Sequence, residues 1–341
     1  MSVETCNTLR CRHRNYTDFL ARCDVCYSLC FPCLLAHLNQ HAGVTHAICE
    51  NWLDTAAISL SLRSGFQHYH WNFSSADIAA SFFSHYEGRI DSIRIKNPSS
   101  ESTALCTVLI QFDHIKRISV TGLELQSDAA HRAFAAWIRC QTRLSRLSLS
   151  YSRFTGRAFS YLSTGLSSNF LHELTLSSVS LPDGCMGELV RRVLDKGSLQ
   201  KLSLRGMKLS ESDLAAIGRV EEQQSLKVLK LTELSILGGN HLPEFLEKLK
   251  GLETLEMVDR AGKTLQSVGW SLARCPRLRK LALFSHHPYR LLFLPFILPS
   301  LPHLRLLTLH ESTLQVEFSP AFLDSLTSLL LSFPRNINGE V

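Results

Sequence analysis

The sequence contains no apolar run long enough to cross a membrane and no dense cluster of basic residues. Its most apolar stretch, LLFLPFILPSLP at residues 291–302, is shorter than the roughly 20 residues of a spanning helix, and prolines interrupt it. The first residues, MSVETCNTLRCRHRN, lack the apolar segment of a secretory signal. The net charge of +6 is mild for 341 residues, so nucleic acid is not the expected partner. The composition predicts a folded protein of the cytoplasm, with the nucleus as an alternative.

Catalytic motifs are also absent from the sequence. Neither the G-x-S-x-G turn of serine hydrolases nor the HExxH helix of zinc proteases occurs. The GKT at residues 262–264 lacks the glycine that a phosphate-binding loop requires five positions earlier, where Met257 stands. We therefore expect a protein that binds a partner and is not an enzyme.

An internal repeat occupies most of the sequence. The pattern L-x-x-L-x-L, with aliphatic residues at the first, fourth and sixth positions, recurs ten times at intervals of 22–29 residues. The alternation within each repeat predicts a short strand with its aliphatic side chains buried. Segments with helical spacing lie between strands, at residues 187–197, 212–220 and 242–251. The repeats begin at Ile90, Ile115, Leu144, Leu171, Leu199, Leu226, Leu252, Leu278, Leu304 and Leu326.

The period and the strand pattern resemble those of the leucine-rich repeat family. This resemblance implies an α/β solenoid of about ten repeats over residues 89–341, curved into a horseshoe like the ribonuclease-inhibitor class. The turns after the strands must satisfy their backbone groups without the family's usual side chains. The position that is commonly Asn or Cys in the family is here occupied by Leu123, Val179, Met207 and Leu234.

The strand residues between the buried positions would form the inner face of such a horseshoe. In the first half of the array these positions carry small hydroxyls bordered by basic residues, whereas acids such as Glu233 and Glu256 come later. We expect an interaction scaffold or adaptor whose basic half binds an acidic peptide or helix of a protein partner. The predicted partner-binding residues are Arg94, Lys96, Arg117, Arg146, Ser148, Lys201, Ser203, Arg205 and Lys230.

A cluster of cysteine and histidine lies near the start of the chain. Most of the eleven cysteines precede residue 50, and the segment CDVCYSLCFPCLLAHLNQHAGVTH (residues 23–46) combines several of them with histidines. In a reducing compartment such a cluster indicates metal binding rather than disulfides. Two Cys-x2-Cys pairs flanked by further Cys and His residues suit structural, tetrahedral zinc. The later cysteines are scattered, and we give them no role.

The order of these ligands resembles the B-box zinc finger of tripartite-motif proteins. The resemblance implies a finger at residues 1–50 that holds two structural zinc ions. Because the family usually spaces its first pair Cys-x2-His, Cys6 is an alternative to Cys11 as the first ligand. The family's interleaved arrangement would place one ion on Cys11, His13, Cys30 and Cys33, and the other on Cys23, Cys26, His41 and His46.

A second zinc fold has a similar ligand rhythm. Cys30, His37, His41 and His46 resemble the end of the ubiquitin-tail-binding finger of certain deubiquitinating enzymes and ligases. This alternative makes ubiquitin a candidate partner, and the chain a substrate-recognition or ubiquitin-binding component of a ubiquitin-ligase system. GTPase activation, an activity of another leucine-rich repeat family of similar curvature, is a further alternative that no particular loop of this sequence supports.

Residues 51–88 connect the two parts. The segment SADIAASFFSHYEGRI at residues 75–90 has the spacing of an amphipathic helix, so we expect a helical connector that also caps the first repeat. Its FFSHYE, at residues 82–87, resembles the start of the repeats in a centrosomal leucine-rich repeat protein. That resemblance adds the centrosome and cytoskeleton as alternative locations.

Overall fold

The computed structural model describes residues 58–64, 67–73, 90–96, 103–123, 127–166, 169–236, 241–258, 263–284, 293–309 and 314–317. The chain divides into two units. Unit 1 runs to Ser145 and includes Ser160–Asn169, whereas unit 2 comprises Arg146–Phe159 and the chain from Phe170 onward. Helix α7 (Gly156–Leu166) contributes residues to both units. The predicted domain boundaries at residues 50 and 88, and the tenth repeat at Leu326, lie outside the described residues.

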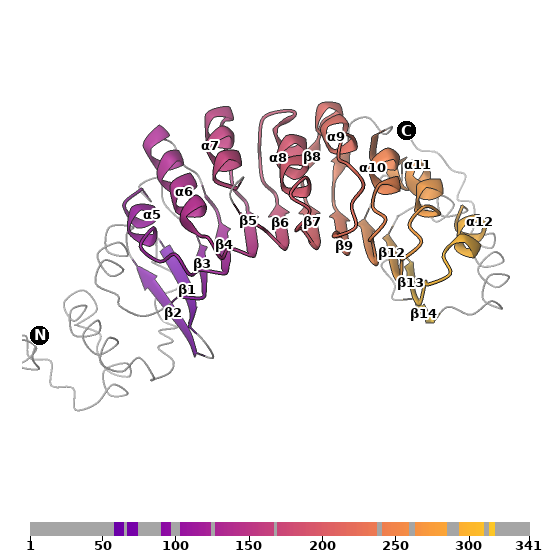
Figure 1. The fold of residues 1–341 in the computed structure, drawn as a ribbon, viewed down its shortest axis with the longest axis horizontal. Coiled ribbons are helices and arrows are strands. Elements are labelled where there is room, and N and C mark those ends of the chain that lie inside the picture. Colours follow the sequence, from indigo (N-terminus) through magenta and orange to yellow (C-terminus); the bar gives the residue numbers. More distant parts are fainter. Residues whose placement is uncertain are drawn as a thin grey trace, which may run out of the picture. The chain divides into compact units, whose positions relative to one another are not determined.

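The sheet of unit 1 has the strand order β2-β1-β3-β4. Strands β3 (Ser92–Lys96) and β4 (Arg117–Thr121) are parallel and lie at the first two predicted repeats. Helices α5 (Thr103–Leu109) and α6 (Asp128–Cys140) cover one face of these strands (Figure 1). Helix α6 begins where the Ser127 side chain accepts a hydrogen bond from the Ala130 amide. Its apolar face buries Trp137.

The connector is not helical where the structure describes it. Strands β1 (Ile58–Ser64) and β2 (Gln67–Phe73) form an antiparallel hairpin, and β1 also pairs antiparallel with β3. The prediction of a helical connector is therefore wrong for these residues. Apolar residues alternate in ISLSLRS and aromatic residues alternate in QHYHWNF, and this period of two suits strands. The hairpin covers the edge of β3 and so caps the first repeat. The helix predicted at residues 75–90 lies, apart from Ile90, outside the described residues.

Unit 2 is built from parallel strands in the order β5-β6-β7-β9-β11-β12-β13, and β14 (Leu314–Glu317) pairs antiparallel with the last of them. Each parallel strand lies at a predicted repeat. The strands are β5 (Arg146–Ser150), β6 (Glu173–Ser177), β7 (Lys201–Arg205), β9 (Val228–Thr232), β11 (Thr254–Val258), β12 (Lys280–Phe284) and β13 (Leu306–Leu309). The repeat pattern thus predicted these strands correctly.

The helices of unit 2 lie on one face of its strands (Figure 1). The three segments that were predicted to be helical form α8 (Cys185–Leu194), α9 (Glu211–Gly218) and α10 (His241–Glu247). Later repeats contain α11 (Lys263–Leu272), the short α12 (Leu294–Ile297) and the 3-10 turn η3 (Leu298–Ser300). Two short strands, β8 (Lys208–Leu209) and β10 (Ser235–Ile236), form a separate parallel ladder.

Rows of leucine form the core of unit 2. Strand register places the second residue of every parallel strand beside its equivalent in the next repeat, and each of these leucines is at most 1% exposed. A fully buried leucine contributes about 1.5–3 kcal/mol, so this row is a principal source of stability. Its members are Leu147, Leu174, Leu202, Leu229, Leu255, Leu281 and Leu307.

The turn after each strand satisfies its backbone groups through the neighbouring repeat. In four successive repeats the residue that follows the strand has a left-handed conformation, with φ between 50° and 59°. Its amide extends the strand ladder, as in the 2.8 Å hydrogen bond from the Tyr151 amide to the Ser177 carbonyl. Backbone groups thus make the hydrogen bonds in the turn that an Asn side chain would otherwise make. These left-handed residues are Tyr151, Ser178, Gly206 and Glu233.

Candidate functional site

The predicted zinc ligands lie outside the described residues, so the zinc finger stays a prediction. Within the part of the chain that the structure describes, no cluster of three His, Cys, Asp or Glu residues could hold a metal ion. The predicted ligands are Cys11, His13, Cys23, Cys26, Cys30, Cys33, His41 and His46.

The predicted partner-binding residues all lie on strands, at exposed or partly exposed positions. Burial alternates along each parallel strand, so the first, third and fifth residues lie on the side away from the core. Parallel register then brings equivalent residues of successive repeats side by side within each unit. In each unit we call this surface the strand face, defined by the first, third and fifth residues of its parallel strands. The structure thus assembles the predicted residues into rows.

The first row of unit 2 is an ion-pair ladder across three strands. Glu173 of β6 lies between Arg146 of β5 and Lys201 of β7. One carboxylate oxygen is 3.4 Å from Arg146 Nε and the other is 2.5 Å from Lys201 Nζ. Glu173 therefore offsets part of the positive charge of this row, because its one negative charge is shared by two cations.

Two further predicted cations of unit 2 are also paired. Lys230 Nζ lies 2.5 Å from the Glu256 carboxylate on the next strand, and Arg205 Nε lies 3.3 Å from that of Glu233. The expected separation of a basic half from a later acidic half therefore fails at these positions. Register brings the acid of one repeat beside the base of the repeat before it.

A similar pair lies just before β9 and β11. Lys227 Nζ donates to the Glu253 carboxylate at 2.8 Å. This hydrogen bond has the largest effect on the pKa of Glu253 and lowers it. Burial raises the pKa by less than the hydrogen bond lowers it, and the positive charges of Arg279 and Arg277 lower it further. Glu253 is thus held in its charged form among cations.

Small hydroxyls occupy the middle row between the charged ladders. Ser148, Thr175 and Ser203 are register partners on β5, β6 and β7, and all three are partly exposed. The predicted floor of hydroxyls is confirmed here. Such a row leaves space above the strands and offers hydrogen bonds to an approaching ligand.

The predicted cations of unit 1 differ from those of unit 2. Arg94 and Lys96 on β3 and Arg117 on β4 are exposed. None of them forms an ion pair with any residue that the structure describes. Their strand neighbours are Ser92, Ser119 and Thr121 rather than acids.

The sequence reasoning identified these bases but missed their pairing. Arg146, Glu173 and Lys201 occupy the same position in three successive repeats, and this alignment alone would have predicted adjacency in a parallel sheet. The signal was therefore present in the sequence. To find it, acids and bases have to be compared at the same position of successive repeats rather than along the chain.

A buried carboxylate, which the sequence reasoning also missed, joins two repeats. Asp213 on α9 is 3% exposed, and it accepts the Ser210 amide and hydroxyl at 3.0 and 2.6 Å in a capping box. Its other oxygen accepts the Gly187 amide in the first turn of α8 at 2.8 Å. A Cβ at Gly187 would lie 2.1 Å from the Asp213 carbonyl oxygen, so only glycine permits this approach. Asp213 therefore caps two helices at once.

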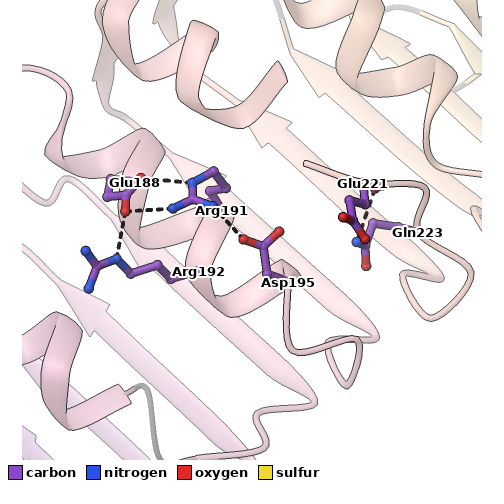
Figure 2. Close-up of polar contacts among 6 residues, drawn as sticks. All are labelled: Glu188, Arg191, Arg192, Asp195, Glu221 and Gln223. Atoms are coloured by element: carbon purple, nitrogen blue, oxygen red, sulfur yellow. Dashed lines mark hydrogen bonds and ion pairs between the residues drawn. The ribbon is translucent and has the colours of Figure 1, made fainter. Parts of the chain in front are cut away.

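Glu188 lies in a network of charged residues along α8 and its C-cap Asp195 (Figure 2). Glu188 accepts hydrogen bonds from Arg191 at 2.9 Å and from Arg192 at 2.7 Å, and Arg191 also contacts Asp195 at 2.7 Å. The bond from Arg191 is the largest cause that lowers the pKa of Glu188 to about 2. These pairs join residues three or four apart on one helix, so the network stabilises α8.

The four cysteines that the structure describes are free thiols. Burial raises the pKa of Cys106 to about 12 and that of Cys275 to about 11. Cys275 Sγ donates to the Leu246 carbonyl at 3.4 Å. Such thiols remain protonated near neutral pH and are poor nucleophiles.

Comparisons with known proteins add little to this geometry. No family model matches the chain, and no curated protein matches it. Among solved structures, a chain from the crystal structure of the Rad7 and Elc1 complex in yeast is similar with a TM-score of 0.35 and 16% sequence identity, over 70% of this chain and 75% of that one. No helix in the described part of the chain is both long and apolar enough to cross a bilayer.

Proposed function

We propose that this chain is a non-enzymatic interaction scaffold of the leucine-rich repeat type, and that it binds a protein partner on its strand face. The observation that carries the proposal is the strand register, which aligns equivalent side chains of successive repeats in rows. A protein segment can contact several repeats of such rows at once, and this is how stacked repeats commonly bind. The coincidence of parallel strands with the L-x-x-L-x-L repeats supports the family assignment.

Photo-crosslinking in cells tests which face the partner contacts. A photoreactive amino acid would replace Ser148 or Ser203 on the strand face, with Glu211 on α9 and Glu244 on α10 as exposed control positions. We expect one defined protein adduct from both strand positions and none of that mass from the helix positions. The same adduct from the helix positions alone would refute the proposal.

We further propose that residues 1–50 form a zinc-stapled second docking module. Thiolate and imidazole are the ligands of structural zinc, and a segment of this size with few large aliphatic residues needs such a staple to fold. Zinc per chain, measured on the full-length protein, tests this directly. We expect two zinc ions, reduced by the substitutions Cys30→Ser and Cys33→Ser. Three ions would favour the ubiquitin-tail finger and make ubiquitin the first ligand to assay, whereas none would refute a zinc module.

A further inference from the structure

We propose that the partner supplies an acidic segment, rich in carboxylates, and that this segment binds unit 1 at the cations of β3 and β4. The inference rests on the proposed function, because it assumes that the partner contacts the strand face. It adds the part of that face and the chemistry that is bound there.

The unpaired cations of unit 1 carry the argument. Arg94, Lys96 and Arg117 are exposed, and no described carboxylate lies within ion-pair distance of them. In unit 2, by contrast, Arg146 and Lys201 already contact Glu173. A ligand carboxylate would have to displace an existing ion pair in unit 2, whereas in unit 1 it would gain a new one. The two adjacent strands β3 and β4 thus carry three cations with no carboxylate among them, and this dense positive charge favours an acidic partner there.

The register of the sheet extends this acid-free region beyond β3 and β4. Antiparallel pairing places Ser61 of β1 opposite Arg94, and Arg63 of β1 opposite Ser92. No acidic residue occupies any register position of these three rows on β1, β2, β3 or β4. The residues of β2 at these register positions are His68, His70 and Asn72. Asp91 precedes β3 and lies outside them.

The spacing of the cations suits a peptide. Arg94 and Lys96 are two residues apart on one strand, which corresponds to roughly 7 Å. Arg117 lies diagonally across from Arg94, at a separation of roughly 7–8 Å. Carboxylates on alternate residues of an extended segment, or one turn apart on a helix, have comparable spacing. Guanidinium groups can bind carboxylates through two parallel hydrogen bonds, and Ser119 and Thr121 add hydroxyl groups between the cations.

A protein segment fits these rows better than nucleic acid does. Sheets that bind single-stranded RNA stack bases on exposed aromatic residues. The rows on β3 and β4 contain Ser, Thr, Arg and Lys but no Phe, Tyr or Trp. A surface of this kind recognises charge and hydrogen-bond acceptors without a platform for bases.

Fluorescence anisotropy with a labelled peptide of ten glutamates tests the inference on the full-length protein. The double substitution Arg94→Glu and Arg117→Glu should weaken binding by about tenfold or more, because each reversal replaces an attraction with a repulsion. The matched control is Lys196→Glu with Arg219→Glu. Both control residues are exposed in unit 2 and off its strands, and the change in net charge is the same. We expect the control to weaken binding by about threefold or less.

A neutral variant, Arg94→Gln with Arg117→Gln, keeps the test valid if charge reversal disturbs folding. It should weaken binding by an intermediate factor while the thermal midpoint stays at the wild-type value. Equal losses in the strand and control variants would mean that only net charge matters, and would overturn the inference. No measurable binding by the wild type would overturn it as well. A single-stranded RNA of equal charge that binds more tightly, and is lost with the same reversal, would overturn the choice of a peptide.

The inference and the proposed function can fail separately. If reversal at Arg94 and Arg117 leaves the cellular crosslink at Ser203 intact, the strand face still binds a partner, so the function stands and the assignment to unit 1 falls. If crosslinks arise only from the helix positions, both fall.

Discussion

The substitution Asp213→Ala should destabilise the protein far more than its position in the first turn of a short helix suggests. Asp213 is 3% exposed, and its two carboxylate oxygens accept hydrogen bonds from Gly187 of one repeat and from Ser210 of its own. Alanine leaves the Gly187 amide without its acceptor inside the protein, which costs about 1–3 kcal/mol. It also removes half of a capping box, at about 0.5–2 kcal/mol. We therefore expect a loss of about 2–4 kcal/mol in the free energy of unfolding.

Two measurements separate this cause from general damage to the helix. Urea unfolding gives the loss of stability, with Glu211→Ala as the control, because Glu211 is exposed in the first turn of the same helix. The control should lose about 0.5 kcal/mol, the size of a helix-dipole effect. Hydrogen exchange at the Gly187 amide should accelerate in Asp213→Ala and stay unchanged in Glu211→Ala.

A small loss of stability in Asp213→Ala would refute this role of Asp213. If Asp213→Ala loses no more stability than Glu211→Ala, or if the Gly187 amide exchanges at the wild-type rate, then Asp213 does not cap α8. The variant Asp213→Asn should fall between the two, because its amide group keeps the shape but can accept at only one of the two atoms.

Two other predictions concern α8 and the turns. The pKa of Glu188 is lowered from 4.5 to about 2, so its contribution to stability is complete above pH 4.5 and is lost as the pH falls through 2. Glu188→Gln should therefore cost about 1–2 kcal/mol at pH 7, below the full linkage value because the side chain is 28% exposed. The cost should be much smaller at pH 2, and urea unfolding at both pH values measures the difference. Tyr151 has a left-handed backbone conformation, so Tyr151→Gly should raise the free energy of unfolding by about 0.5–1 kcal/mol. Gly206 has the same conformation, so Gly206→Ala should lower the free energy of unfolding by about 1–2 kcal/mol. Thermal unfolding measures both changes, and opposite signs would contradict the turn geometry.

The sequence predicted the strands of this protein because one repeat cannot bury its own core. The leucines at fixed positions, such as Leu174 and Leu202, have to be buried against equivalent residues of neighbouring repeats. Helices at the predicted positions followed for the same reason, since their apolar faces must cover the strands. Periodicity is therefore sufficient for the secondary structure of the described repeats.

The connector and the pairing of charges required more than periodicity along the chain. The alternation in ISLSLRS and QHYHWNF spans only one hairpin, and the prediction of a helical connector rested on the spacing at residues 75–90 alone. The pairing of Glu173 with Arg146 and Lys201 depends on register between repeats. Such contacts become visible only when the repeats are aligned as rows. The same limitation concealed the contact between Asp213 and Gly187, because it joins helices of two repeats.

Lysine footprinting of the full-length protein, bound to the partner that photo-crosslinking identifies, tests the strand face most directly. Acylation rates would be compared with and without the partner at Lys96 on β3, Lys201 on β7, and Lys196 in the turn after α8. Our account predicts slower labelling of strand-face lysines, most strongly at Lys96, and an unchanged rate at Lys196. Protection of Lys196 together with unchanged rates at both Lys96 and Lys201 would contradict the claim that the partner binds the strands.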